Sequence, residues 1–416
     1  MARQFKIDVL EATRLTRQGR LEEAMTVLRD GLSNSPDTDR PAEADAGTSI
    51  VDLVPPSPET GSAWTAPAAT TAAPVHVDHV AARPASWLDG MLDLVLDASP
   101  SARLKARRPR VATQVPVPEG ARFEERSFAN QAGRRSYKLY VPQSLADEAV
   151  PLVVMLHGCT QSSDDFAAGT RMNELAEEHG FIVAYPAQSH DANASGCWNW
   201  FNASDQKRDR GEPSLIAGIT RQIMDEFPVD PDRVFAAGLS AGGATAAIMG
   251  ATYPDLFRAI GVHSGLACGA ARDMPSAFAA MRQGGSPAAH RSDGVVVPTI
   301  VFHGDGDRTV HPVNGTQVVA QAAAQAQGEM KFRTTVTSGQ SPGGVAYTRE
   351  VHSDAAGNGV LENWVLHRAG HAWSGGSPSG SFTDPNGPDA SREMVRFFLK
   401  SSRAERTRLA AIRPRR

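Results

Sequence analysis

The sequence predicts an α/β fold in which helices cover a mostly parallel central sheet. Two observations lead to this class. Short apolar runs alternate with helical patterns from residue 150 to residue 400, which is typical of repeated strand–helix–strand units. One of these runs, residues 150–156, is apolar almost without interruption, as expected of a central strand that is buried on both faces.

We expect the folded domain to span residues 118–401. It should open with two paired strands, at 123–128 and 135–141, because a turn sequence with a glycine separates them at 131–133. Later strands are expected at 150–156, 181–185, 234–237, 259–263, 299–303 and 363–367, and helices at 172–179, 215–227 and 391–400.

The chain outside this domain has a different composition. Residues 1–32 carry leucines and methionine at helical spacing and predict a helical hairpin, which cannot bury its apolar face alone. Residues 33–117 are rich in Pro and Ala and predict a disordered linker that contains a short amphipathic helix at 86–97. Residues 402–416 form a basic tail. We expect the hairpin either to dock on the main domain or to bind a partner.

Charge and hydropathy exclude several classes of partner. The formal net charge of −4 argues against a nucleic-acid-binding surface. No apolar run reaches the roughly 20 residues of a membrane-spanning helix, so no transmembrane segment is expected. The N-terminus lacks the apolar region of a secretory signal, which favours a cytoplasmic location. Three cysteines are too few for a disulfide scaffold.

Ser240 is the candidate nucleophile. It stands in the pattern Gly-x-Ser-x-Gly at residues 238–242, after the apolar run 234–237 and before an Ala- and Gly-rich segment, 243–250. A strand, a sharp turn and a helix in this order form the nucleophile elbow, in which small flanking residues are needed because the turn is tight. The five-residue pattern is weak alone, and the predicted strand and helix around it strengthen the assignment.

His371 is the candidate general base, because a serine hydroxyl needs an imidazole to remove its proton. It lies in a Gly-rich loop between the strand at 363–367 and the last helix, and the order Ser, acid, His is that of α/β-hydrolases. His367 is the nearest competitor, although it falls within a strand pattern. His263 and His303 also end predicted strands and are weaker alternatives.

The acid of the triad should lie in the loop after the strand at 299–303. This loop contains Asp305 and Asp307. Asp307 is preferred because the loop must extend a few residues to reach the histidine, and Asp305 remains the alternative. Such a carboxylate holds the tautomer of the imidazole and stabilises the imidazolium that forms during the reaction.

Two backbone N–H groups should form the oxyanion hole. The amide of Ala241 follows the nucleophile and supplies one donor. The second should come from the loop after the strand at 150–156, where Cys159 is preferred and Thr160 is the alternative.

These motifs together resemble the polyhydroxybutyrate (PHB) depolymerase family of esterases. The resemblance runs from about residue 123 to residue 399, in order. It implies an α/β-hydrolase fold, similarity to feruloyl and acetylxylan esterases, and a triad of Ser240, Asp307 and His371. The motifs that carry it are 156–161 (LHGCTQ), 197–201 (CWNWF), 238–243 (GLSAGG), 302–307 (FHGDGD), 370–373 (GHAW) and 383–390 (TDPNGPDA).

The resemblance also implies a disulfide between Cys159 and Cys197, with two reduced, buried thiols as the alternative. Cys268 is then left unpaired. A loop with Trp198, Asn199 and Trp200 near the site suggests an apolar wall for the substrate. We expect one of these two indoles to line the site and the other to pack in the core. Trp373, beside the histidine, is a further wall candidate.

The sequence therefore predicts a serine esterase that works through an acyl-enzyme and needs no cofactor or metal. The expected substrate is a hydroxyalkanoate polymer or oligomer, or another short ester. Many members of the resembled family are extracellular. Because no signal peptide or separate substrate-binding domain is visible, soluble hydroxyalkanoate oligomers and other short esters become credible substrates beside the insoluble polymer. A feruloyl or acetylxylan-type carbohydrate esterase is the alternative. An alternative from a different functional class is a binding protein. In this hypothesis the chain binds polymer granules or a protein partner through its N-terminal helices, and its esterase activity is secondary.

Overall fold

The computed structural model describes residues 115–143, 145, 148–285, 295–326 and 331–401. The predicted hairpin at 1–32, the linker at 33–117 with its helix at 86–97, and the basic tail at 402–416 lie outside the described residues, apart from residues 115–117 of the linker.

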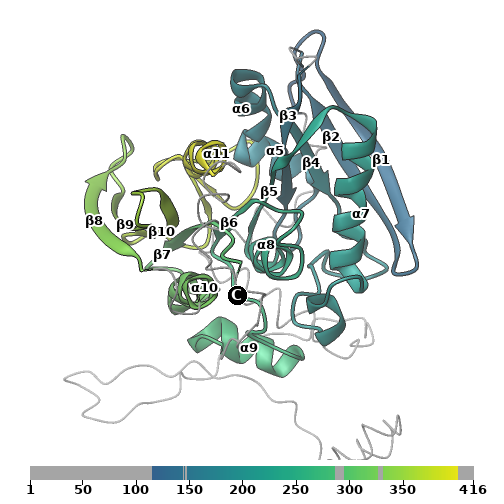
Figure 1. The fold of residues 1–416 in the computed structure, drawn as a ribbon. Coiled ribbons are helices and arrows are strands. Elements are labelled where there is room, and N and C mark those ends of the chain that lie inside the picture. Colours follow the sequence, from purple (N-terminus) through teal and green to yellow (C-terminus); the bar gives the residue numbers. More distant parts are fainter. Residues whose placement is uncertain (1–114, 144, 146–147, 286–294, 327–330, 402–416) are drawn as a thin grey trace, which may run out of the picture. The chain divides into compact units, whose positions relative to one another are not determined.

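A ten-stranded mixed sheet forms the centre of the fold (Figure 1). Its strand order is β1-β2-β4-β3-β5-β6-β7-β10-β9-β8, and all pairs from β4 to β10 in this order are parallel. The predicted α/β class is confirmed. The strands are β1 (Arg122–Asn130), β2 (Gly133–Val141), β3 (Val150–Leu156), β4 (Ile182–Pro186), β5 (Val229–Leu239), β6 (Ala259–His263), β7 (Thr299–Gly304), β8 (Arg333–Gln340), β9 (Ala346–Ser353) and β10 (Gly359–Leu366).

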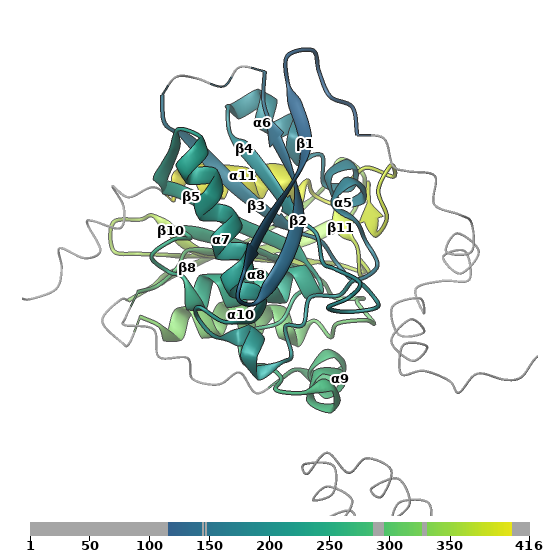
Figure 2. The ribbon, with the colours of Figure 1, turned by 90° about the vertical axis from the view of Figure 1, so that its right-hand side faces the viewer.

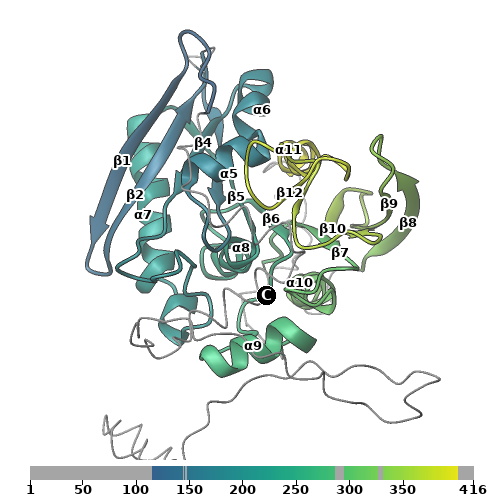
Figure 3. The ribbon, with the colours of Figure 1, turned by 180° about the vertical axis from the view of Figure 1, so that it is seen from behind.

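Antiparallel hairpins extend both edges of the parallel region: β1–β2 at one edge and β8–β9 at the other (Figure 3). The first hairpin matches the paired strands expected from the sequence. The second was not expected, because β8 is exposed along nearly its whole length and lacks the alternation of apolar and polar residues that marks a half-buried strand.

Helices cover both faces of the sheet (Figure 2). Residues of α5, α6 and α11 pack in one apolar cluster, and residues of α7, α8 and α10 pack in the other. Within the described ranges, every helix is too short or too polar to span a lipid bilayer. The helices are α5 (Ser163–Thr170), α6 (Met172–His179), η1 (Ala203–Gln206), α7 (Gly211–Glu226), α8 (Ala241–Thr252), α9 (Met274–Gln283), α10 (Val313–Ala324) and α11 (Ala390–Lys400).

Strand β3 shows why the central apolar runs have no polar positions. All of its residues are buried. Leu152 and Val154 belong to the cluster with α7, α8 and α10, whereas Val153 and Met155 belong to the cluster with α5, α6 and α11. Successive side chains of a strand point to opposite faces, so a strand between two helical layers must be apolar at every position.

The parallel register brings the carboxyl ends of the central strands to one edge of the sheet. Leu156, the last residue of β3, lies opposite Gly238 near the end of β5, and Leu366 of β10 lies opposite Gly304 of β7. The loops that leave this edge carry the residues that the sequence singled out. Strand β10 ends at Leu366, so His367 follows the strand and does not lie within it.

Candidate active site

Ser240 stands at the turn between β5 and α8 in a strained backbone conformation, with φ 57° and ψ −119°. Its N–H donates a hydrogen bond to the carbonyl oxygen of His263 at 2.9 Å, and its own carbonyl accepts from Ala244 N–H at 2.9 Å. Ala241 is the first residue of α8, so its N–H points out of the start of the helix. This is the geometry of a nucleophile elbow.

Two glycines allow the elbow to pack against the end of β3. A Cβ atom on Gly242 would lie 2.0 Å from the carbonyl oxygen of Leu156. A Cβ atom on Gly238 would lie 2.4 Å from the carbonyl carbon of Gly242. Both distances are far shorter than any real carbon contact, so no larger residue fits at either position without displacing backbone.

Asp307 and His371 form a buried pair. Nδ1 of His371 lies 2.7 Å from Oδ2 of Asp307, and the two side chains are 5% and 0% exposed. Oδ1 of Asp307 accepts from the N–H groups of Thr309 and Val310, each at 2.9 Å. Burial opposes ionisation of this carboxyl, but the charge of His371 and hydrogen bonds from His303 and His371 outweigh it and lower the pKa of Asp307. The ionised carboxylate accepts a hydrogen bond from Nδ1–H of His371, which keeps the proton on Nδ1 and leaves Nε2 as a base.

The alternatives that the sequence left open have other partners. Asp305 contacts His367, with Oδ2 and Nδ1 2.9 Å apart, and both side chains are about 40% exposed. His303 lies with Nε2 2.8 Å from the carbonyl oxygen of Val310 and 3.5 Å from Oδ2 of Asp307. The structure thus brings Asp307, and not Asp305, to His371.

The loop that contains Asp307 and the loop that contains His371 are in contact through backbone hydrogen bonds. Gly306 N–H donates to the carbonyl oxygen of Ala369 at 3.0 Å, and Asp305 N–H donates to the carbonyl oxygen of Leu366 at 3.0 Å. A Cβ atom on Gly304 would lie 2.2 Å from the same Ala369 oxygen. The glycines beside Asp307 therefore let the two loops approach closely.

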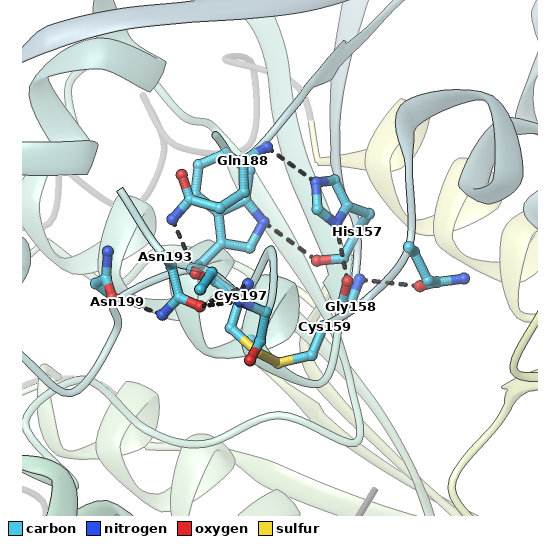
Figure 4. Close-up of a disulfide and its surroundings, with 12 residues drawn as sticks. His157, Gly158, Cys159, Gln188, Asn193, Cys197 and Asn199 are labelled. Atoms are coloured by element: carbon cyan, nitrogen blue, oxygen red, sulfur yellow. Dashed lines mark hydrogen bonds between the residues drawn. A yellow bond between two sulfur atoms is a disulfide. The ribbon is translucent and has the colours of Figure 1, made fainter. Parts of the chain in front are cut away.

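The loop after β3 is held by a disulfide between Cys159 and Cys197, whose Cα atoms are 4.2 Å apart (Figure 4). The N–H of Thr160 donates to the carbonyl oxygen of Ser195 at 3.0 Å, so the alternative oxyanion donor is already engaged. Among the described residues, the Cys159 N–H has no acceptor. The disulfide and the Thr160 hydrogen bond therefore fix the loop around the Cys159 amide.

The ring of His157 gives this loop a second anchor. Its Nδ1 donates to the carbonyl oxygen of Gly158 at 2.8 Å, and its Nε2 accepts from the N–H of Gln188 at 3.1 Å (Figure 4). The indole N–H of Trp198 donates to the His157 carbonyl oxygen at 3.1 Å. Burial lowers the pKa of His157 to about 4, which keeps the ring neutral and suited to both hydrogen bonds.

The three tryptophans that were expected to form a wall for the substrate are deeply buried in the structure. Trp198, Trp200 and Trp373 are buried, with exposed fractions of 0%, 6% and 1%. Both indoles of the 197–201 motif pack in the core instead of only one. The Trp373 N–H donates to Ser391 Oγ at 3.0 Å. Rings that are buried to this extent pack against the loops of the site and support them.

Asn199 is hydrogen-bonded to Glu212. Its backbone N–H and its side-chain amide donate to the two carboxylate oxygens of Glu212, at 2.7 Å and 2.8 Å. Glu212 is buried, lies 3.5 Å from Arg135, and accepts a further hydrogen bond from Gln188. Burial raises the pKa of Glu212, which hydrogen bonds from Gln188 and Asn199 oppose. This cluster fixes the loop that contains Cys197.

Sequence reasoning assigned no role to Gln161, although it stands in the LHGCTQ motif. Its Oε1 accepts from Gly158 N–H at 2.9 Å, and its Nε2 donates to Asp165 and to the carbonyl oxygen of Ser381, both at 3.0 Å. Gln161 thereby joins the loop after β3 to a distant loop. The feature of the sequence that could have identified Gln161 is its position: an amide side chain soon after a buried strand. In the described part of the chain, no group of three or more His, Cys, Asp or Glu side chains is arranged to hold a metal ion.

Comparison with known proteins provides evidence on the family to which the chain belongs. The family model described as esterase PHB depolymerase matches residues 135–334. Poly(3-hydroxyalkanoate) depolymerase C of Paucimonas lemoignei is 31% identical over 256 residues, which cover 59% of this chain and 60% of that protein. Acetylxylan esterase of Coprinopsis cinerea is 30% identical over 284 residues, which cover 62% of this chain and 72% of that protein. Feruloyl esterase B of Thermothelomyces thermophilus is 35% identical over 140 residues, which cover 33% of this chain and 47% of that protein.

A solved structure supports the fold. The acetyl xylan esterase from Aspergillus awamori superposes with a TM-score of 0.51 at 20% sequence identity, covering 67% of this chain and 99% of that one. At this identity the likeness concerns the fold alone. The chain spans about 60% of the length of the Paucimonas lemoignei depolymerase.

Proposed function

Because the chain belongs to the PHB depolymerase family of esterases, in the α/β-hydrolase superfamily, we propose that it hydrolyses carboxylic esters with Ser240 as nucleophile, His371 as general base and acid, and Asp307 as the residue that orients His371. The observation that carries the proposal is the buried Asp307–His371 hydrogen bond of 2.7 Å, at the same edge of the sheet as the strained turn of Ser240.

In the first half of the reaction, Oγ of Ser240 attacks the carbonyl carbon of the ester while Nε2 of His371 takes the hydroxyl proton. The negative charge that develops on the carbonyl oxygen is held by the N–H groups of Cys159 and Ala241. The bond to the alcohol then breaks, the imidazolium returns the proton to the departing oxygen, and an acyl-serine remains.

In the second half, water attacks the acyl carbon and gives a proton to His371. The bond to Ser240 breaks, the proton passes to its oxygen, and the carboxylic acid leaves. Asp307 stays ionised throughout and stabilises the imidazolium in each half. The lowered pKa of Asp307 is consistent with this role.

The proposed substrate is a hydroxyalkanoate polymer or oligomer, a choice supported by the similarity to the Paucimonas lemoignei depolymerase. A carbohydrate esterase is the second candidate, because the match to the Coprinopsis cinerea acetylxylan esterase covers 72% of that protein. Rates on hydroxybutyrate oligomers, acetylated xylan and methyl ferulate separate these candidates. A contact with polymer granules through residues 1–32 and 86–97 is tested by granule binding of the full chain against a chain that begins at residue 118.

The decisive test of the reaction is Ser240→Ala, assayed with short-chain p-nitrophenyl esters. We expect the turnover number to fall by about 10⁴-fold or more. Ser214→Ala, on α7, is the matched control and should keep the wild-type rate. A fluorophosphonate should label the wild-type protein at Ser240 and leave the alanine variant unlabelled. Full activity in Ser240→Ala would refute the proposal.

A further inference from the structure

His263 connects the two halves of the candidate site. It is the last residue of β6 and is fully buried. Its carbonyl oxygen accepts the N–H of Ser240 at 2.9 Å, and its ring Nε2 accepts the N–H of Ser374 at 3.0 Å. Ser374 lies three residues after His371 in the same loop. One residue therefore makes a hydrogen bond to the nucleophile's backbone and another to the loop of the base.

We propose that His263 is a positioning residue for ester hydrolysis, which holds the turn of Ser240 and the loop of His371 at a fixed distance from each other. This inference rests on the proposed function, since it concerns the alignment of those two groups. It also explains why His263 is not itself the base: its Nε2 is occupied by the Ser374 N–H and cannot take the serine proton.

Neighbouring rings fix the direction in which the imidazole points. His263 stacks on Trp373, with ring centroids 5.2 Å apart and an interplanar angle of 27°. It also stacks on Phe302, with centroids 5.8 Å apart and an angle of 13°. Phe302 in turn stacks on Trp364 of β10, at 5.2 Å. A fully buried ring with two stacked aromatic neighbours has little room to rotate, so its Nε2 remains aimed at Ser374.

The protonation state fits the same role. Burial, together with the charges of His303 and His371, lowers the pKa of His263 to about 3, against the opposing effect of Asp307. The ring is therefore neutral at neutral pH. Its Nδ1 lies 3.3 Å from the hydroxyl oxygen of Ser264 and carries the proton, which leaves Nε2 free to accept. An imidazolium at this position would lose the hydrogen bond to Ser374.

Two amide variants of His263 separate positioning from packing. His263→Gln places an amide oxygen near the position of Nε2 and should retain the hydrogen bond to Ser374. His263→Asn has a shorter side chain whose oxygen cannot reach that position. We expect His263→Asn to lower kcat by about 10- to 100-fold with KM within about twofold, because misplacement of catalytic groups by about 1 Å has effects of this size. His263→Gln should stay within about fivefold of wild-type kcat.

Hydrogen exchange provides a readout that does not depend on activity. The amide of Ser374 should exchange faster in His263→Asn than in the wild type and should remain protected in His263→Gln. Phe398→Leu is the packing control, because Phe398 lies in the same apolar cluster as Phe302 and Trp373 but stacks on Phe235. If Phe398→Leu lowers the melting temperature as much as His263→Asn does, we still expect it to keep the wild-type kcat.

The outcomes are distinct from those that test the proposed function. If Ser240→Ala is inactive but His263→Asn and His263→Gln have equal kcat and equal exchange at Ser374, the positioning role is wrong and the esterase proposal stands. The positioning role is also wrong if Phe398→Leu, at the same melting temperature as His263→Asn, loses as much kcat as His263→Asn does. Should His263→Asn not fold, the inference is decided by His263→Gln alone, which must keep both the kcat and the protection.

Discussion

Oδ2 of Asp307 and Nδ1 of His371 are 2.7 Å apart in a buried contact, although the residues follow different strands. A second pair, Asp305 and His367, lies on the same two loops at 2.9 Å and is open to solvent. The two pairs differ mainly in burial, and this provides a direct comparison within one protein.

Replacing Asp307 with Asn should lower kcat by about 10⁴-fold, because the imidazole loses the carboxylate that fixes its tautomer and stabilises its charged form. Asp305→Asn is the matched control and should stay within about twofold, since exposed ion pairs contribute little. The measurement is steady-state hydrolysis of a p-nitrophenyl ester by both variants. Equal losses would mean that the burial of the Asp307 pair has no role in catalysis.

Removal of the disulfide should affect both stability and turnover. Cys159 and Cys197 are separated by 38 residues, for which the loss of loop-closure entropy predicts a decrease of about 4 kcal/mol in the free energy of unfolding. The double variant Cys159→Ser with Cys197→Ser should also lose up to about 100-fold in kcat, because the Cys159 amide is no longer held in place. Urea unfolding and ester hydrolysis measure the two effects.

The control for the disulfide is Cys268→Ala. Cys268 is a buried free thiol, because Cys159 and Cys197 pair with each other. Burial raises its pKa to about 12, so it stays protonated near neutral pH. We expect little change in kcat for this variant. A double variant with the same unfolding midpoint and kcat as the wild type would contradict the assigned role of the disulfide.

Acid should destabilise the fold through two buried histidines. An unfolded histidine gains a proton near pH 6.5, whereas the pKa of His157 is about 4 and that of His263 about 3 in the folded protein. As the pH falls from about 6.5 to 4, the unfolded state binds more protons than the folded state. The free energy of unfolding should then decrease by up to about 1.4 kcal/mol per pH unit for each histidine.

This slope can be assigned by substitution. His157→Gln should reduce it by up to about 1.4 kcal/mol per pH unit between pH 6 and pH 4, measured by urea unfolding. Above pH 7 the histidine is neutral in both the folded and the unfolded state. The difference in stability between His157→Gln and the wild type at this pH therefore does not come from protonation. An unchanged slope would show that His157 gains its proton equally in both states.

Gly242→Ala should abolish activity and lower stability by several kcal/mol, because the new Cβ atom would lie 2.0 Å from the carbonyl oxygen of Leu156 and displace the end of β3. Gly370→Ala is the control: no atom lies within 4 Å of its Cβ position, and its melting temperature should stay close to that of the wild type. Thermal unfolding of both variants provides the test, and a stable, active Gly242→Ala protein would contradict the close packing of the elbow.

Much of the site could be predicted from the sequence because its chemistry is local. The glycines at 238 and 242 mark a tight turn around Ser240, and the loops with Asp307 and His371 directly follow apolar runs. The parallel order of strands then brings these loops together. The choice of Asp307 over Asp305 depended on the reach of a loop, and the structure has Asp307 beside His371.

The surroundings of the site were harder to predict because they depend on distant contacts. Trp198 donates its indole N–H to a carbonyl 41 residues away, and the sequence does not reveal that this ring is covered. Helix α5 contacts a loop near the end of the chain, where Ser377 N–H donates to Gly169. Within the part of the chain that the structure describes, β8 pairs only with β9, and its exposed residues leave no apolar pattern to detect.

The parallel order β3-β5-β6-β7-β10 has a consequence for how the chain acquires activity during folding. The groups that meet at the sheet edge, from Cys159 to His371, follow strands that are far apart in the sequence. Strand β10 is the last of these strands in the chain. Such long-range pairings form slowly. A partly folded chain that has completed the sheet only as far as β7 has Ser240 and Asp307 but no base. Recovery of activity on refolding should therefore report the docking of β10 and lag behind the burial of the strands up to β7.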